Sequence, residues 1–304
     1  MRLNGIHHIT CVTADARRNL DFYTQVLGLR LVKKTVNQDD PSIYHLFYAD
    51  EAGSPGADIT FFEFPGAPPG AAGAGMVHTI VSRVASERAL EFWAERLASS
   101  GVDVTNTKDR LDFRDPEGLH HEFAVARVDD EPLAAQHPDI DAAFALQGFD
   151  GVRAYAEDPT HGSHFLSGAL GFEGSVESSA WRVDGPTRSA FYARDMPPDT
   201  SARPGPGTVH HVAFSTALEE QARWHDLLRS AGANPSPVID RFWFRSIYFR
   251  EPSGVLFELA TEGPGFTTDE PLERLGEKLT LPPQLEPMRE RIEATLTPLP
   301  NQRR

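Results

Sequence analysis

Residues 208–214 read Thr208-Val209-His210-His211-Val212-Ala213-Phe214, and residues 251–259 read Glu251-Pro252-Ser253-Gly254-Val255-Leu256-Phe257-Glu258-Leu259. Both stretches are rich in β-branched and aromatic residues, which favour strands, and Pro252-Ser253-Gly254 is a turn signal. The amphipathic segment from Leu218 to Ser230 predicts a helix between them. A histidine and a carboxylate on strands separated by one helix are a candidate pair of metal ligands.

Three pairs of segments repeat along the chain and divide it into four similar units. The pairs are Phe22…Leu27-Gly28-Leu29 with Phe165…Leu170-Gly171-Phe172, Trp93…Leu97…Gly101 with Trp224…Leu228…Gly232, and Asp115-Pro116-Glu117-Gly118…Glu122-Phe123 with Glu251-Pro252-Ser253-Gly254…Glu258-Leu259. Odd units resemble odd units and even units resemble even ones. Each unit reads as a strand, a helix and about three strands, beginning near residues 5, 76, 148 and 208.

This repeat predicts an α+β fold of four βαβββ modules that form two half-open barrels, because one module is too small to close a sheet alone. The Gly/Pro/Ala-rich run 65–75 and the polar run 127–143 are predicted linkers. The predicted regions are 1–145 (modules 1–64 and 76–126), 146–265 (modules 146–196 and 207–262), and a tail at 266–304. The tail is predicted to dock through a short helix with Leu285, Met288, Ile292 and Leu296 on one face.

Composition narrows the function classes. With 29 Lys and Arg against 44 Asp and Glu, the formal charge is −15, which disfavours nucleic acid and anionic membrane surfaces as partners. The single cysteine, Cys11, excludes an intrachain disulfide framework and fits a reducing compartment. No apolar run approaches the length of a membrane span, and no signal-peptide pattern opens the chain. We therefore expect a cytoplasmic, soluble protein.

Histidine usage suggests where a metal would bind. The chain has twelve histidines, and a single strand histidine is usually structural. Gly5-Ile6-His7-His8-Ile9-Thr10 resembles the His210-His211 strand, whereas unit 2 carries His78-Thr79 and unit 3 has no histidine at this place. Unit 1 is therefore predicted to pack beside unit 4, so that a histidine of each meets Glu258. Alternation along a strand would turn only one histidine of each pair towards the concave side.

Glu258 and its repeat partner Glu122 receive different predictions. Leu256 and Ala260 share the face of Glu258, and a lone carboxylate in that apolar setting would be costly without a cation. Glu122 has Thr79 where a second histidine would stand, so we expect it to be an ordinary strand glutamate exposed to water.

The four-unit plan resembles the vicinal oxygen chelate superfamily, the fold of glyoxalases and extradiol dioxygenases. Resemblance is closest to its branch of ring-cleaving dioxygenases acting on hydroquinones. The residues and motifs that carry it are Gly5-Ile6-His7-His8-Ile9-Thr10, Val209-His210-His211, Arg241, Tyr248, Glu258 and Leu281-Pro282-Pro283…Leu285-Glu286-Pro287.

The resemblance implies Fe(II), or alternatively Mn(II), held by His8, His211 and Glu258. It implies an aromatic substrate that binds as a phenolate, with O₂ as the second substrate, and it allows a homo-oligomer. Arg241 and Tyr248 would offset the phenolate charge. His7, Thr10 and His210 would line the pocket or orient the ligands. Phe242, Trp243 and Phe244 are predicted to lie in a buried strand.

Two alternatives remain open from the sequence. A glyoxalase-type isomerase or lyase would use Ni²⁺ or Zn²⁺ and a fourth protein ligand, for which Glu63 is the best candidate. A binding protein built on the same cup would hold aromatic molecules without turnover. Oxygen consumption with a hydroquinone distinguishes the dioxygenase from both.

Overall fold

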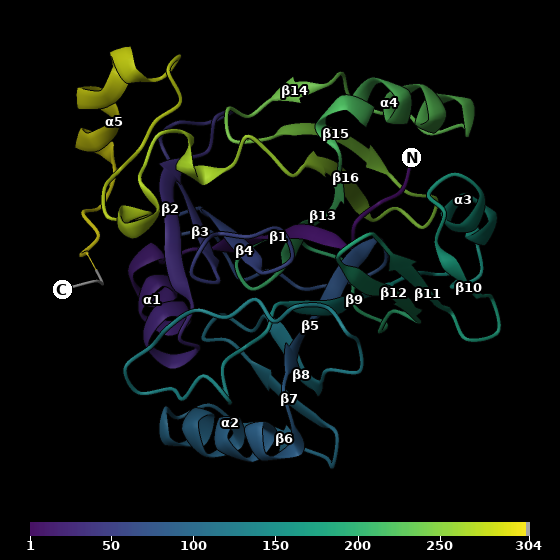
Figure 1. Cartoon of the computed structure of the whole chain (residues 1–304), viewed down its shortest axis with the longest axis horizontal. Coiled ribbons are helices and arrows are strands. Elements are labelled where there is room, and N and C mark those ends of the chain that lie inside the picture. The colour runs from purple at the N-terminus through teal and green to yellow at the C-terminus, as the bar shows by residue number, and fades with distance from the viewer. Residues whose placement is uncertain (302–304) are drawn as a thin grey trace.

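The computed structural model describes residues 1–301, which form two eight-stranded sheets with short helices packed against them (Figure 1). The first sheet has the strand order β14 (Ile239–Asp240), β15 (Arg245–Arg250), β16 (Leu256–Thr261), β13 (Val209–Thr216), β1 (Ile6–Thr13), β4 (Asp58–Glu63), β3 (Tyr44–Ala49) and β2 (Arg30–Val36). The second has the order β10 (Glu173–Ser175), β11 (Ala180–Asp184), β12 (Ser189–Asp195), β9 (Phe149–Tyr155), β5 (Met76–Val84), β8 (His120–Val125), β7 (Arg110–Arg114) and β6 (Val104–Asn106).

Both sheets are built to the same plan. In the first, β1 and β13 pair antiparallel at the centre, and β4 and β16 flank them in parallel. In the second, β5 and β9 pair antiparallel, and β8 and β12 flank them in parallel. The first sheet thereby places β1, from the first module, beside β13, from the fourth, at the centre of the molecule (Figure 1). The α+β class predicted from the repeat is confirmed.

The helices follow from their capping residues and apolar spacing. They are α1 (Ala16–Asp21), continued by the π-helical turn η1 (Phe22–Val26), α2 (Glu87–Ser99), α3 (Ser163–Gly168) and α4 (Gln221–Ser230), preceded by the 3₁₀ turn η2 (Leu218–Glu220). The Ser86 side chain caps α2 by accepting from the backbone N–H of Ala89. Leu90, Trp93 and Leu97 recur at three- and four-residue spacing and bury one face of α2 against the second sheet.

The segment after β16 runs back along β2 through η3 (Phe266–Thr268), η4 (Leu272–Arg274), η5 (Glu286–Met288) and α5 (Arg289–Thr295) (Figure 1). Leu285, Ile292 and Leu296 are buried there, whereas Met288 is 37% exposed. Met288 was therefore wrongly included in the predicted apolar face, because it lies in the 3₁₀ turn η5, before the α-helix begins.

Two hydrophobic clusters hold these parts together. The larger includes residues of both sheets and the helices that cover them, and Cys11 is buried within it. The smaller packs Trp243, Phe244 and Phe266 against Ala213 and Ala260 of the first sheet. None of the helices within residues 1–301 combines the length and the apolar character that a membrane span requires.

Candidate metal centre and aromatic pocket

Strand register aligns the predicted ligands on one face of the first sheet. His8 on β1 lies opposite Ala213 on β13, which lies opposite Glu258 on β16. Glu258 in turn lies opposite Tyr248 on β15. In the next row, His211 lies opposite Thr10. Because residues paired across a sheet share a face, these side chains converge, and the small Ala213 leaves space between His8 and Glu258.

Three ligand-type atoms meet at this point. Nε2 of His8 is 3.2 Å and Nε2 of His211 is 2.8 Å from Oε2 of Glu258, and the two nitrogens are 3.3 Å apart. All three residues are buried. Within the described part of the chain, they form the one group of three or more His, Cys, Asp or Glu residues close enough to share a metal ion.

Glu258 is a buried carboxylate without the partners that such a group normally has. Neither of its oxygens accepts a well-formed hydrogen bond from a described residue. Burial raises its pKa, but the adjacent imidazoles of His8 and His211 outweigh burial and hold the pKa well below the usual 4.5. An ionised carboxylate here calls for a cation, and two imidazoles with one carboxylate suit a divalent transition metal with open positions. The residues therefore fit the metal that the family resemblance implied.

His7 controls the tautomer of His8. Nε2 of His7 lies 3.0 Å from the carbonyl oxygen of Thr261, which can only accept, so this nitrogen carries the proton. Nδ1 of His7 is then an acceptor, 2.9 Å from Nδ1 of His8. His8 therefore donates from Nδ1, and its Nε2 is the nitrogen that faces Glu258 and is available to a metal. Burial, with the charge of His8, lowers the pKa of His7 to about 3, so the His7 ring stays neutral.

His210 makes the corresponding contact on β13. Its Nδ1 lies 2.7 Å from Nδ1 of His211 and can accept the proton that leaves Nε2 of His211 unprotonated. The β1–β13 register skips His7 on one strand and His210 on the other. Simple alternation would have turned these residues away, but the two bulges let them lie beside the ligand histidines.

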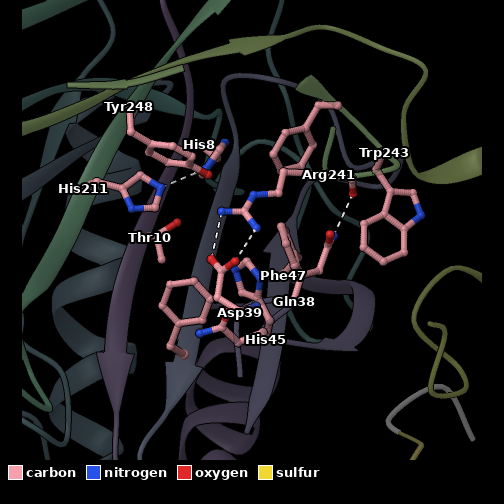
Figure 2. A pocket seen from close by; sticks show the side chains of 13 residues that line it. His8, Thr10, Gln38, Asp39, His45, Phe47, His211, Arg241, Trp243 and Tyr248 are labelled. Carbon is pink, nitrogen blue, oxygen red and sulfur yellow. Dashed lines mark hydrogen bonds and ion pairs between the residues drawn. The ribbon is translucent and has the colours of Figure 1, made fainter. Parts of the chain in front are cut away.

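A pocket lined by polar and aromatic side chains opens above the triad. Figure 2 shows the side chains that line it. Of the predicted site residues, Thr10, Arg241 and Tyr248 line it. His7 and His210 do not line it and instead contact the two ligand histidines. Its apolar walls are Phe47, Phe62, Trp243 and Phe244.

Arg241 is held by an ion pair at the mouth of this pocket. Its two terminal nitrogens donate to the two oxygens of Asp39 at 3.1 and 2.9 Å, and its guanidinium lies 5.6 Å from the Tyr248 ring centre (Figure 2). Asp39 is 73% exposed and Arg241 is 16% exposed. Burial, with the nearby charge of Glu258, raises the pKa of the Tyr248 phenol, which therefore stays protonated.

The aromatic stretch before β15 differs from its prediction. Residues 241–244 form a turn between β14 and β15, not a strand, and Phe242 adopts a left-handed backbone with φ of 73°. The turn directs Trp243 and Phe244 into the pocket, where the indole nitrogen of Trp243 donates to Asp269 at 2.9 Å. Burial of the aromatic side chains was expected, but the turn that gives them a role in the pocket was not.

Several pocket residues were not predicted, because no repeated motif of the sequence marks them. His45 and Phe47 come from β3, and Gln38 and Asp39 come from the loop after β2. The signal for His45 was its two-residue spacing from Phe47, which places both on one face. Asp39 lies in a run that reads simply as a turn.

Glu63, the candidate fourth ligand of an isomerase, lies elsewhere. Its Oε1 accepts from the backbone N–H of Ala16 at 2.9 Å and caps α1. It does not belong to the group formed by His8, His211 and Glu258. The isomerase alternative therefore loses its best fourth ligand.

Comparisons with known proteins agree with this geometry. The sequence model described as "Glyoxalase/Bleomycin resistance protein/Dioxygenase superfamily" matches residues 5–123 and 148–259. MhqA of Bacillus subtilis, provisionally named a ring-cleaving dioxygenase, is 41% identical over 98% of this chain and 100% of its own length. A chlorohydroquinone/hydroquinone 1,2-dioxygenase of Sphingobium indicum is 33% identical over 97% of this chain and 96% of its own.

Solved structures give the same picture. The crystal structure of a provisionally assigned dioxygenase from Bacillus subtilis superposes with a TM-score of 0.92 and 38% identity, covering 99% of each chain. Glyoxalase I from Zea mays has a TM-score of 0.57 at 14% identity over 85% of this chain and 92% of its own, a likeness in fold alone. The resemblance inferred from sequence is confirmed.

Proposed function

Because this chain belongs to the Glyoxalase/Bleomycin resistance protein/Dioxygenase superfamily, we propose that it is a ring-cleaving dioxygenase that inserts both atoms of O₂ into a hydroquinone-type phenol. Fe(II) would be held by His8, His211 and Glu258. One observation carries the proposal: two buried imidazoles converge on a buried carboxylate at the floor of an aromatic-lined pocket. Mn(II) accepts the same ligands and is the alternative metal.

The bound ion would supply a Lewis acid that lowers the pKa of a coordinated phenol and an open position for O₂ beside it. The protein groups around it hold the reactants. His7 and His210 accept the Nδ1 protons of the two ligand histidines and keep each Nε2 available.

Tyr248 and Arg241 would act on the substrate oxygen. Tyr248 stays protonated and donates a hydrogen bond to the developing phenolate, and the guanidinium of Arg241 offsets its charge. Phe47, Phe62, Trp243 and Phe244 exclude water and hold the ring against the metal site. Relatives named as ring-cleaving dioxygenases over nearly the whole chain support an oxygenase reaction on this scaffold.

Oxygen incorporation tests the proposal directly. Protein purified without oxygen and loaded with Fe(II) should consume one O₂ for each hydroquinone, and both atoms of ¹⁸O₂ should appear in the ring-opened product. A glyoxalase-type isomerase or a binding protein would consume no oxygen. Turnover with Fe(II) but not with Zn²⁺, Ni²⁺ or Mn²⁺ identifies the metal, whereas turnover with Mn²⁺ alone would reject the iron assignment.

A further inference from the structure

His45 is a pocket residue without an assigned role. It lies on β3, and its ring centre is 4.0 Å from that of Phe47 and 4.3 Å from that of Phe62. These contacts hold the imidazole rigidly within the pocket wall (Figure 2). The first sheet places β3 and β15 on opposite sides of the β1–β13 centre, so His45 and Tyr248 approach the triad from opposite sides.

Two threonines determine which nitrogen of His45 carries its proton. Thr60 donates its hydroxyl proton to Oγ1 of Thr10 at 2.9 Å. The Thr60 oxygen can then accept from Nε2–H of His45, which lies 2.9 Å away. In the neutral ring this assignment leaves a lone pair on Nδ1. Burial lowers the pKa of His45 well below 6.5, as do the charges of nearby groups such as His8, so the ring is neutral at physiological pH.

Nδ1 of His45 has no hydrogen-bond partner among residues 1–301, although His45 lines the pocket. Phe47 and Phe62 beside it offer no donor. Because Thr10 accepts from Thr60 in this series of hydrogen bonds, the hydroxyl proton of Thr10 is free to point into the pocket. This wall therefore presents a fixed acceptor, Nδ1 of His45, beyond the triad. His45 is linked through Thr60 to Thr10, which is two residues, or about 6.7 Å of strand, from His8. A para-dihydroxylated ring with one oxygen at the metal carries its second O–H away from the metal.

We propose that His45 is the specificity residue for the second hydroxyl group of the substrate, accepting its hydrogen bond through Nδ1. The inference rests on the proposed function, because one substrate oxygen must occupy the metal site. A hydroquinone satisfies both ends of the pocket. A phenol whose second oxygen lacks a proton leaves Nδ1 without a donor and loses affinity.

Equilibrium binding without oxygen tests this role apart from turnover. Hydroquinone and 4-methoxyphenol are titrated into Fe(II)-loaded protein, with Trp fluorescence as the signal. The wild type should bind hydroquinone about 10-fold more tightly, the size of one well-formed hydrogen bond in a buried site. His45→Phe should lose most of that preference by weakening hydroquinone alone, while affinity for 4-methoxyphenol changes less than about twofold. His45→Asn, which keeps a side-chain acceptor, should restore part of the preference.

A purely structural role for His45 would weaken both ligands equally or lower the iron stoichiometry. An unchanged preference in His45→Phe, with hydroquinone still turned over by the wild type, overturns this inference alone. A wild type that consumes no oxygen with hydroquinone overturns the proposed function and this inference with it. Iron content and thermal unfolding of both variants establish that the pocket is intact.

Discussion

Glu258 and Glu122 hold the same place in the two sheets, yet their surroundings differ completely. Glu258 lies opposite Ala213 and beside two histidines. Glu122 lies opposite Val81 and is paired with Arg110 at 3.0 Å and Arg153 at 3.3 Å. Glu122 is buried, so the prediction of an exposed glutamate was wrong. Both carboxylates need a positive charge: two arginines supply it to Glu122, whereas the described residues within ion-pair distance of Glu258 are the imidazoles of His8 and His211 and include no Lys or Arg.

The second sheet has also lost the space that a metal would need. Thr79 and Gly151 stand where the first sheet has His211 and His8, and Arg153 stands where it has Thr10. A Cβ atom at Gly151 would lie 2.4 Å from Cδ1 and 2.5 Å from the carbonyl oxygen of Phe191. A histidine therefore cannot be accommodated at Gly151 without moving Phe191. One scaffold thus carries an ion-pair network in one sheet and a candidate metal site in the other.

The largest expected effect comes from removing a ligand histidine. His211→Ala should lower iron content below about a tenth of the protein concentration and oxygen uptake with hydroquinone by on the order of 1,000-fold, more than the loss of a residue that only orients a ligand. Iron analysis after anaerobic purification measures the first and an oxygen electrode the second. Thr79→Ala, at the matching position of the second sheet, is the control and should retain both. Full iron stoichiometry in His211→Ala would reject the ligand assignment.

Substitution of the two glutamates should affect different properties: unfolding free energy for Glu122 and metal binding for Glu258. Glu122→Gln leaves Arg110 and Arg153 without their shared partner and should lower the free energy of unfolding by about 3 kcal/mol while iron stoichiometry stays the same. Arg110 is half-exposed, which keeps the loss towards the lower end of the range for a broken buried pair. Glu258→Gln should abolish iron binding.

Urea unfolding of the metal-free proteins distinguishes the two roles. Glu258→Gln should lower the stability of the metal-free protein much less than Glu122→Gln does, because it leaves no arginine or lysine without its partner among the described residues. Equal losses of stability in the two variants, or lost iron in Glu122→Gln, would show that the two sheets are less different than their contacts indicate.

The same comparison shows how much of the fold and of the site could be predicted from the sequence. The repeat predicted the fold class and a site made by Glu258 with one histidine from each of units 1 and 4. The family resemblance then singled out His8 and His211. Neither could predict the burial of Glu122, since Arg153 comes from a neighbouring module, and cross-strand partners depend on sheet register. His45 and Asp39 escaped for a similar reason: only the packing of β3 beside β4 brings them to the pocket.

His78 and His210 occupy the same bulge position in the two sheets, and His78 offers a pH test free of metal. Burial lowers the pKa of His78 to about 4, although Asp195 opposes the shift. Between pH 4 and 6.5 the unfolded chain therefore binds this proton and the folded chain does not. Stability from His78 is present above pH 6.5 and is lost as pH falls, by about 2 kcal/mol at pH 5.

His78→Gln should flatten this part of the stability curve. The slope of unfolding free energy against pH, measured by urea unfolding of metal-free protein from pH 6.5 to 4.5, should fall by close to one proton, or about 1.4 kcal/mol per pH unit. The wild type, unfolded in the same buffers, is the reference for this slope. An unchanged slope in His78→Gln would mean that His78 is protonated in the folded protein.

The smallest effect is expected from a substitution at Asp39. It concerns the acidic partners of the arginines in the two sheets. In the second sheet Arg153 pairs with buried Glu122, whereas Arg241 of the first pairs with exposed Asp39 across the pocket mouth. An exposed pair contributes less than about 1 kcal/mol, so an incoming phenolate can compete with Asp39 for the guanidinium. Asp39→Asn should therefore lower KM for hydroquinone by about two- to fivefold with kcat nearly unchanged, and more at low salt than at high salt. If KM rises instead, Asp39 is needed to hold Arg241 where it contacts the substrate. Asp39 would then be as necessary to Arg241 in the first sheet as Glu122 is to Arg153 in the second.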